Sequence, residues 1–233
     1  MGKFGQRTKV SDKIWDRTVG LIGESGIGKT TVMSAVCEKL VGEDGYIVLD
    51  IGKENGTDCI NNITAEKIES YAKWEEVTND IINNKKDYPN LKIVVVDTMD
   101  QLLAITEPYA ISAWNKANIG TKDFKKATTL NAAWGGFGKG MDKVLELILD
   151  KIEKLRMVGV KVWFCGHTKT KEITDPLTSN TYTSLTADAT QKYFVGIKTK
   201  FDVVGVACIN REVSKEETNK KNVMTKKNER EEE

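Results

Sequence analysis

One stretch, Gly23-Glu24-Ser25-Gly26-Ile27-Gly28-Lys29-Thr30, constrains the fold of this chain more than any other. It matches the pattern G-x-x-x-x-G-K-[ST] and lies between a short apolar run at 18–22 and a helical pattern at 31–40. Glycines let the backbone curl so that several N–H groups point at one phosphate, and the following helix adds its positive end. The stretch therefore predicts a phosphate-binding loop between a strand and a helix of an α/β sheet.

The polar residues of this loop predict a site for ATP and magnesium. Lys29 can reach the β- and γ-phosphates, and the Thr30 hydroxyl can ligate magnesium, which prefers hard oxygen ligands. The residues that we expect to bind the nucleotide are those of the loop and the one that follows: Gly23, Glu24, Ser25, Gly26, Ile27, Gly28, Lys29, Thr30 and Thr31.

Apolar runs alternate with helical patterns along the rest of the chain. The runs predict strands at 18–22, 46–51, 91–97 and 160–165, with two more at 181–186 and 202–209. The spacing of apolar residues predicts helices at 31–40 and 141–158 and surface helices within 61–86, whereas 101–140 is less regular. Such alternation predicts an α/β fold with a mainly parallel central sheet flanked by helices and ligands at the carboxyl ends of the strands.

The same pass along the chain suggests its organisation. Residues 1–17 are interpreted as a leader, 18–210 as an ATPase core with an insertion at about 101–140 beside the active face, and 211–233 as a charged, disordered tail. With 233 residues, of which 39% are hydrophobic, the chain is long enough for one sizeable core.

The overall composition bears on the location and partners of the protein rather than on its reaction. The chain has 35 Lys and Arg against 34 Asp and Glu, so net charge alone does not indicate a nucleic-acid partner. Its four cysteines include no C-x-x-C pair, which argues against a zinc site or a disulfide framework. No apolar run is long enough to span a bilayer, and we expect a cytoplasmic protein without a membrane partner.

Acidic residues after two of the predicted strands are candidates for the second half of the site. Asp97 ends the apolar run 93–96 and fits the acid that holds magnesium, and Asp100 is a weaker candidate for the same role. Hydrolysis also needs a group that orients or deprotonates water. Of Asp50 and Glu54, which follow the second strand, we favour Glu54 as the catalytic acid; a solvated loop acid is the alternative.

The only histidine of the chain, His167, directly follows the strand predicted at 160–165. In P-loop ATPases with an added central strand, a polar residue at this position senses the γ-phosphate, and His167 is our candidate for that role. Lys169, Lys171, Lys198 and Lys200 lie beyond it, and one of them could act on the phosphate of a neighbouring subunit. Solvated surface lysines are the simpler interpretation.

Three other functions share the phosphate loop. A small-molecule kinase usually carries an arginine-rich lid, but Arg156 is the only arginine between Arg17 and Arg211. A GTPase is suggested by Asn84-Lys85-Lys86-Asp87, which matches the guanine-reading pattern Asn-Lys-x-Asp. These residues lie before the strand that ends at Asp97 and not after a late buried strand, so we regard the match as accidental. An ATP-gated assembly or scaffold module with little turnover would use the same binding residues and stays open.

Beyond the phosphate loop, Val95-Val96-Asp97-Thr98, Gly166-His167-Thr168-Lys169 and the segment 175–200 carry a family resemblance. Over residues 18–210, the chain resembles the RecA-like P-loop ATPases encoded by bacteriophages, some of which are single-strand annealing recombinases. The resemblance implies a RecA-like core, ATP-dependent assembly into a homo-oligomeric ring or filament, and DNA-stimulated action on single-stranded DNA in recombination, annealing or repair. In a phage protein, the expected location is the cytoplasm of the host cell.

A sequence feature that could contact DNA lies in the insertion. Trp134-Gly135-Gly136-Phe137-Gly138-Lys139 supplies aromatic rings and a cation, and Lys122, Lys125 and Lys126 precede it. Single strands bind to basic surfaces with aromatic platforms, so this segment is our candidate for DNA contact. A loop that packs locally as a lid is an equal alternative.

Overall fold

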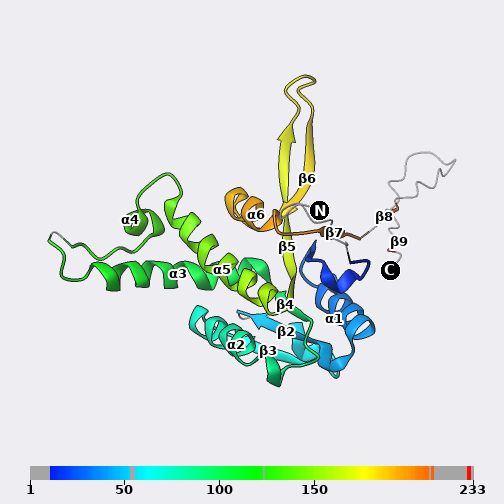
Figure 1. Cartoon of the computed structure of the whole chain (residues 1–233). Coiled ribbons are helices and arrows are strands. Elements are labelled where there is room, and N and C mark those ends of the chain that lie inside the picture. Colours follow the sequence, from blue (N-terminus) through cyan, green and yellow to red (C-terminus); the bar gives the residue numbers. More distant parts are fainter. Residues whose placement is uncertain (1–10, 53–55, 123, 210, 213–229, 232–233) are drawn as a thin grey trace, which may run out of the picture.

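The computed structural model describes residues 11–52, 56–122, 124–209, 211–212 and 230–231. Its main sheet has seven strands, and their order across the sheet is β3-β2-β4-β5-β1-β7, with β6 paired to β5 (Figure 1). The strands of this sheet are β1 (Val19–Gly23), β2 (Tyr46–Ile51), β3 (Ala65–Ile68), β4 (Ile93–Asp97), β5 (Lys161–Thr174), β6 (Thr181–Ala187) and β7 (Val203–Ala207). A short pair, β8 (Arg211–Glu212) and β9 (Arg230–Glu231), stands apart from it.

Helices cover both faces of this sheet, but unequally. The helices are α1 (Lys29–Val41), α2 (Tyr71–Asn83), α3 (Met99–Asn118), α4 (Leu130–Trp134), α5 (Lys139–Met157) and α6 (Gln191–Lys198). Short 3-10 turns occupy Ile14–Asp16, Glu43–Gly45, Gly56–Cys59 and Lys85–Asp87. The direction of the strands tests the predicted fold class. All strand pairs of the main sheet are parallel except β5 with β6, and this confirms the predicted α/β fold with a mainly parallel sheet.

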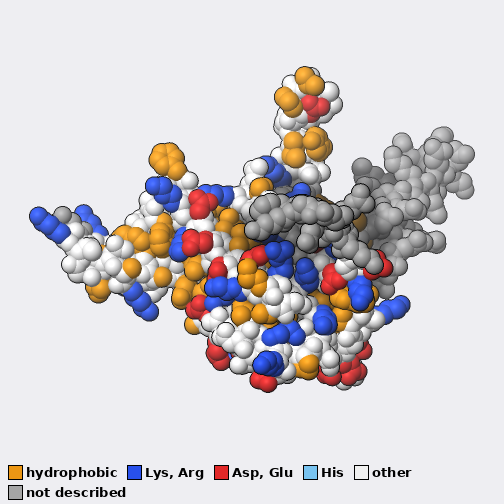
Figure 2. Space-filling model, in the orientation of Figure 1, with side chains coloured by type: hydrophobic (Ala, Val, Ile, Leu, Met, Phe, Trp, Pro, Cys, Tyr) orange, Lys and Arg blue, Asp and Glu red, His pale blue; other side chains and the backbone are white. Residues whose placement is uncertain are grey.

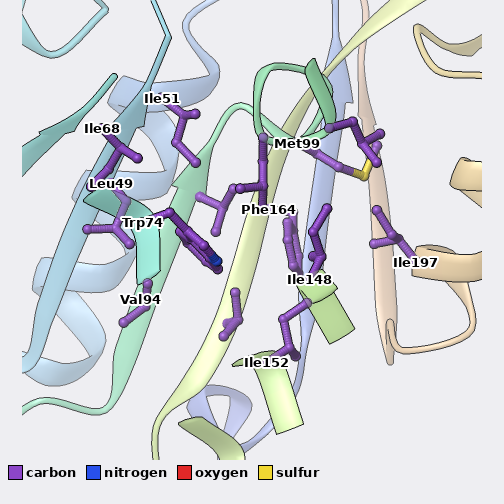
Figure 3. Close-up of a cluster of buried hydrophobic side chains, with 14 of the residues drawn as sticks. Leu49, Ile51, Ile68, Trp74, Val94, Met99, Ile148, Ile152, Phe164 and Ile197 are labelled. Atoms are coloured by element: carbon purple, nitrogen blue, oxygen red, sulfur yellow. The ribbon is translucent and has the colours of Figure 1, made fainter. Parts of the chain in front are cut away.

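The larger hydrophobic core lies on the face covered by α2, α3, α5 and α6. Trp74, Met99, Ile148 and Ile197 project from these helices towards Phe164 and the other apolar side chains of the sheet (Figure 3). On the opposite face, Met33 and Cys37 of α1 pack in a smaller cluster. Strand β4 contributes to both cores, because alternate side chains of a strand point to opposite faces. Strand β4 is therefore buried on both of its faces.

Two segments fold differently from the expectation. The sequence pattern of 101–140 is irregular, but most of this stretch is helical: α3 alone has 20 residues and continues through Pro108. Its first half is held by tertiary packing, because Leu102, Leu103, Thr106 and Ala110 are buried. The pattern of 61–86 predicts helices, but residues 65–68 form the edge strand β3, which only its pairing with β2 reveals.

Two elements extend away from the sheet. Strand β5 has 14 residues, and from Thr168 onward it pairs only with β6, which makes a two-stranded hairpin. The far half of α3, with α4 and the start of α5, forms an arm on another side of the molecule (Figure 1). We call these the hairpin (residues 168–187) and the arm (residues 109–143). Residues 1–10 and most of the tail lie outside the described residues, so the predicted leader and disorder stay predictions.

Candidate nucleotide site

The phosphate loop joins the end of β1 to the start of α1, as the sequence predicts. Gly26 and Gly28 have positive φ angles of 79° and 90°, which favour glycine. Gly28 is the N-cap of α1 and makes no side-chain cap, so the first N–H groups of the helix point outward from its positive end. A helix N-terminus with such free N–H groups is a site where anions bind. Thr31, in the same first turn of α1, has an exposed side chain.

Lys29 is almost fully buried, with 6% of its surface exposed. Its Nζ donates hydrogen bonds to the carbonyl oxygens of Gly23, at 3.2 Å, and Glu24, at 2.8 Å. A buried ammonium group is costly unless it is hydrogen-bonded or paired with a negative charge. The loop carbonyls supply part of that compensation, and a bound phosphate would supply the rest.

Thr30 and Asp97 meet although 67 positions separate them in the sequence. The Thr30 hydroxyl donates a hydrogen bond of 2.5 Å to Oδ2 of Asp97, which ends the buried strand β4. A hydroxyl and a carboxylate side by side are the hard oxygen ligands that magnesium prefers. Within the described residues, no group of three or more His, Cys, Asp or Glu side chains could hold a metal ion.

The pKa of Asp97 is raised above its ordinary value. Burial is the main cause, and the nearby charge of Asp50 adds to it, whereas the hydrogen bond from Thr30 and the charges of Lys29 and His167 act in the opposite direction. A cation at this position would favour the ionised carboxylate and so reverse the effect of burial. The raised pKa therefore reports mainly the burial of this carboxylate at the end of β4.

Two buried hydroxyl groups directly follow candidate site residues in the sequence. The Thr98 and Thr168 hydroxyl oxygens, each one residue beyond a site residue, are buried and make no hydrogen bond with the described part of the chain. A buried polar atom without a partner costs free energy, which a polar ligand would recover.

The loop after β2 returns to the same place. A Cβ atom added at Gly56 would lie 3.4 Å from Thr30 Oγ1 and 3.9 Å from Asp97 Oδ2. The next residue, Thr57, donates its hydroxyl to the buried carboxylate of Asp50, which is the register partner of Asp97. Glu54 lies outside the described residues, so its catalytic role stays a prediction. The sequence did not indicate Gly56 or Thr57.

His167 lies at the end of the inner part of β5, the strand between β1 and β4. Its register partner is Gly23, the first glycine of the loop. Asp100, in the first turn of α3, accepts a hydrogen bond from the His167 backbone N–H at 3.1 Å and pairs with its ring Nδ1 at 3.0 Å. The structure thus places His167 beside the first glycine of the loop and joins it to Asp100, while the roles predicted for these two residues stay predictions.

Two of the four candidate lysines have partners within the chain. Lys169 pairs with Asp188 at 3.2 Å, and Lys198 lies over the ring of Phe194. Asn84-Lys85-Lys86-Asp87 comes just before the amino end of β4, opposite the end that carries Asp97, which supports an accidental match to the guanine pattern. Within the described residues, no helix is long and apolar enough to cross a membrane.

The chain is similar to a known protein family and to a solved structure. A family model described as an AAA domain matches residues 16–232. A solved structure titled "Structural and biochemical analysis of a prototypical ATPase from the type III secretion system of pathogenic bacteria" is similar at 10% identity, with a TM-score of 0.47. The similarity covers 82% of this chain but only 51% of that one, so this chain spans about half of its length. No curated protein matches.

Proposed function

Because the chain belongs to the AAA domain family of P-loop ATPases, we propose that it binds ATP with magnesium, hydrolyses it, and couples hydrolysis to single-stranded DNA. The observation that carries the ATPase part is the contact between Thr30 and Asp97 beside the buried Lys29. The role that we propose in the cell is that of a phage RecA-like protein in recombination, annealing or repair.

Each residue of the site has a place in this reaction. The N–H groups of the loop and Lys29 bind the phosphates and neutralise charge that develops on the γ-phosphate, while Thr30 and Asp97 hold the metal. Magnesium, when bound, would supply further positive charge that stabilises the negative charge developing on the phosphates. Water attacks the γ-phosphorus, the bond to the β-phosphate oxygen breaks, and ADP and phosphate leave. Glu54 is the proposed acceptor of the water proton.

The arm supports the DNA part of the proposal. Its 35 residues contain six lysines and two aspartates, in a chain whose net charge is only +1. Lys122, Lys125 and Lys126 are exposed, and Figure 2 shows Lys and Arg side chains gathered at the far end of the arm. Most of the affinity of proteins for nucleic acid comes from such cations.

The turn between α4 and α5 presents an aromatic ring on the same arm. Phe137 is fully exposed and has a φ of 59°, between Gly136 and Gly138. Lys192 donates to the Gly138 carbonyl at 2.8 Å and pairs with Asp142 at 2.6 Å, which fastens the turn to α5 and α6. A large apolar ring held in water is costly, and stacking on a base would offset that cost.

We also propose that the protein self-associates. Strand β7 is at the edge of the sheet, and its Val203, Val204 and Val206 side chains are exposed. An exposed apolar edge strand is a ready surface for another chain. The partner that we propose is a second copy, in a ring or a filament, because the family resemblance implies such assemblies.

ATP hydrolysis by the purified protein, with and without single-stranded DNA, tests the proposed activity. We expect magnesium-dependent turnover that rises with DNA and falls by about 10²- to 10³-fold in Lys29→Ala, because one preorganised donor to the transition state is removed. ATP binding without turnover in either condition would reject the ATPase proposal in favour of an ATP-gated scaffold. Transfer of phosphate to a small molecule would instead identify a kinase.

A salt titration of single-strand binding tests the arm. The triple variant Lys122→Ala, Lys125→Ala, Lys126→Ala should bind more weakly, and the salt slope should fall by about 0.7 for each DNA phosphate that the variant no longer neutralises. Phe137→Ala should weaken binding by about 1–3 kcal/mol with little change in the salt slope, since stacking is not ionic. The matched control is Lys39→Ala, Lys86→Ala, Lys92→Ala, three exposed lysines outside the arm. Equally weakened DNA binding in both triple variants would show that the arm is not the DNA-binding surface.

A further inference from the structure

The short turn Gly56–Cys59 brings a third segment of the chain to Thr30 and Asp97. A Cβ atom added at Gly56 would lie 3.4 Å from Thr30 Oγ1 and 3.9 Å from Asp97 Oδ2. Among the described residues, no other atom outside its chain neighbours would lie within 4 Å of that carbon. A side chain at this position would therefore point at the two oxygens that we assign to the metal ion, and glycine leaves that space open.

The size of this space matches what a magnesium ion needs. Magnesium binds its ligands at about 2.1 Å in an octahedron, so neighbouring ligand atoms lie about 3 Å apart. The added carbon would lie only slightly farther than that from both oxygens. A methyl group at Gly56 would therefore compete for space with the ion or with one of the water molecules that magnesium usually keeps.

Strand β2 anchors this turn through a buried hydrogen bond. The Thr57 hydroxyl donates to Oδ2 of Asp50 at 2.5 Å, and these residues are only 6% and 3% exposed. Asp50 has a register partner on each side, Asp97 on β4 and Lys67 on β3, so its backbone is fixed within the sheet. Lys67 also pairs with Asp58 of the turn at 3.0 Å, but both side chains are exposed, and such pairs contribute little. The hydrogen bond from Thr57 is therefore the main tether.

We propose that the turn Gly56–Cys59 is a wall of the magnesium site, in which Gly56 leaves room for the hydrated ion and Asp50 is a positioning residue that holds the turn through Thr57. This inference rests on the proposed binding of ATP with magnesium. It adds residues that lie outside the phosphate loop and the strand of Asp97. Asp50, one of the two acids considered for catalysis from the sequence, acts here through Thr57 and does not touch the substrate.

The metal dependence of nucleotide binding tests the role of Gly56. The Kd of a non-hydrolysable ATP analogue for the full chain is measured with Mg²⁺ and in EDTA, and the ratio of the two values reports how strongly metal and nucleotide are coupled. Gly56→Ala should lower this ratio by about tenfold or more, because the methyl group takes the space of the ion. The Kd in EDTA should change by less than about threefold, since Lys29 and the N–H groups of the loop are unaltered.

A matched pair of variants at Thr57 tests the tether. Thr57→Val keeps the shape of the side chain but removes the hydroxyl, and it should lower the metal ratio by about tenfold. Thr57→Ser keeps the hydroxyl and should stay within about threefold of the wild type. The control is Thr78→Val, which removes another buried hydroxyl, one that donates to the Trp74 carbonyl at 2.7 Å within α2. This control should keep the wild-type ratio, and thermal unfolding should show that each variant folds.

Binding of Mn²⁺ gives a direct readout that needs no turnover. Electron paramagnetic resonance counts free Mn²⁺ in the presence of the full chain and the same ATP analogue. Gly56→Ala and Thr57→Val should each need about ten times more Mn²⁺ for half-saturation than the wild type, whereas Thr57→Ser and Thr78→Val should not. If one of the first two variants does not fold, the other still gives the comparison.

A metal ratio within about twofold of the wild type in folded Gly56→Ala, or equal ratios in Thr57→Val and Thr57→Ser, would overturn the proposal. The same loss in Thr78→Val would also overturn it, because the effect would then come from any lost buried hydrogen bond. A wild-type chain whose nucleotide affinity does not depend on Mg²⁺ would reject this wall together with the proposed metal site. A chain that binds the metal and ATP but never hydrolyses it would reject only the proposed hydrolysis, and the variants would still decide on the wall.

Discussion

The two halves of strand β5 have the same backbone conformation and opposite surroundings. Residues 161–167 lie between β1 and β4, and Val162 to Gly166 are buried. Residues 168–174 pair only with β6 and are mostly exposed. The inner half is apolar because it faces two cores, whereas the outer half is rich in Thr and Lys because it faces water. One strand thus serves the core, the site and the surface in turn.

The inner half of β5 therefore stabilises the fold, whereas the side chains of the hairpin are accessible from solvent. A side chain of the inner half packs against neighbours whose positions cannot adjust freely, so its removal leaves a cavity. A side chain of the hairpin has water on one side, and shortening it removes little packing. His167 lies at the boundary, where the rigid half fixes a functional group next to the phosphate loop.

The largest effect should follow a change in the inner half. Phe164 is 1% exposed and packs against Phe201, with ring centroids 5.3 Å apart. Phe164→Ala should lower the free energy of unfolding by about 3–5 kcal/mol, because it leaves a large cavity in the core. Urea denaturation measures the change, and a decrease below about 1 kcal/mol would mean that this half of β5 is not the packed centre of the sheet.

A change at Asp97, at the polar end of the core, should have a smaller effect and should raise the free energy of unfolding rather than lower it. Burial raises the pKa of Asp97, so its carboxyl group favours the folded state at low pH, and this contribution is lost as the pH rises through the folded-state pKa. Asp97→Asn should therefore stabilise the magnesium-free protein near neutral pH by about 1 kcal/mol, and the gain should shrink as the pH falls. Thermal unfolding of both proteins in EDTA, from neutral to acidic pH, measures this difference in stability.

The same variant should lose magnesium-dependent ATP hydrolysis, because an amide is a weaker ligand for the metal than a carboxylate. Higher stability with lower activity is the expected pair of results for a buried acid that serves a ligand. A destabilised Asp97→Asn protein would indicate that Asp97 is structural rather than a metal ligand.

The smallest effect should follow a change at the end of the hairpin. Leu177 is 93% exposed in the turn that joins β5 to β6. Leu177→Ala should change the free energy of unfolding by no more than about 0.5 kcal/mol, since almost no packing is removed. A larger decrease, seen in urea denaturation of a dilute sample, would show that the end of the hairpin is packed against another surface rather than exposed to water.

Much of the core can be predicted from the sequence, because periodicity and β-branched runs report burial directly. The patterns predict the strands β1, β2 and β4 and the helices α1 and α5 near their observed bounds. They do not predict the long helix α3, since Pro108 interrupts its pattern, while burial of Leu102 and Leu103 holds it in place. They also miss the edge strand β3, because Glu66 and Lys67 face water at the edge of the sheet.

The phosphate loop can be predicted from the sequence because its contacts are local: six positions separate Lys29 from the Gly23 carbonyl that it binds. The pairs that complete the site are not local. Thr30 with Asp97 and Asp100 with His167 are each 67 positions apart, and the strand order β4-β5-β1 brings them together. Motif spacing records short-range geometry, whereas contacts across a parallel sheet depend on how the helical crossovers place each strand. Asp100 therefore becomes a partner of His167 only once the chain is folded.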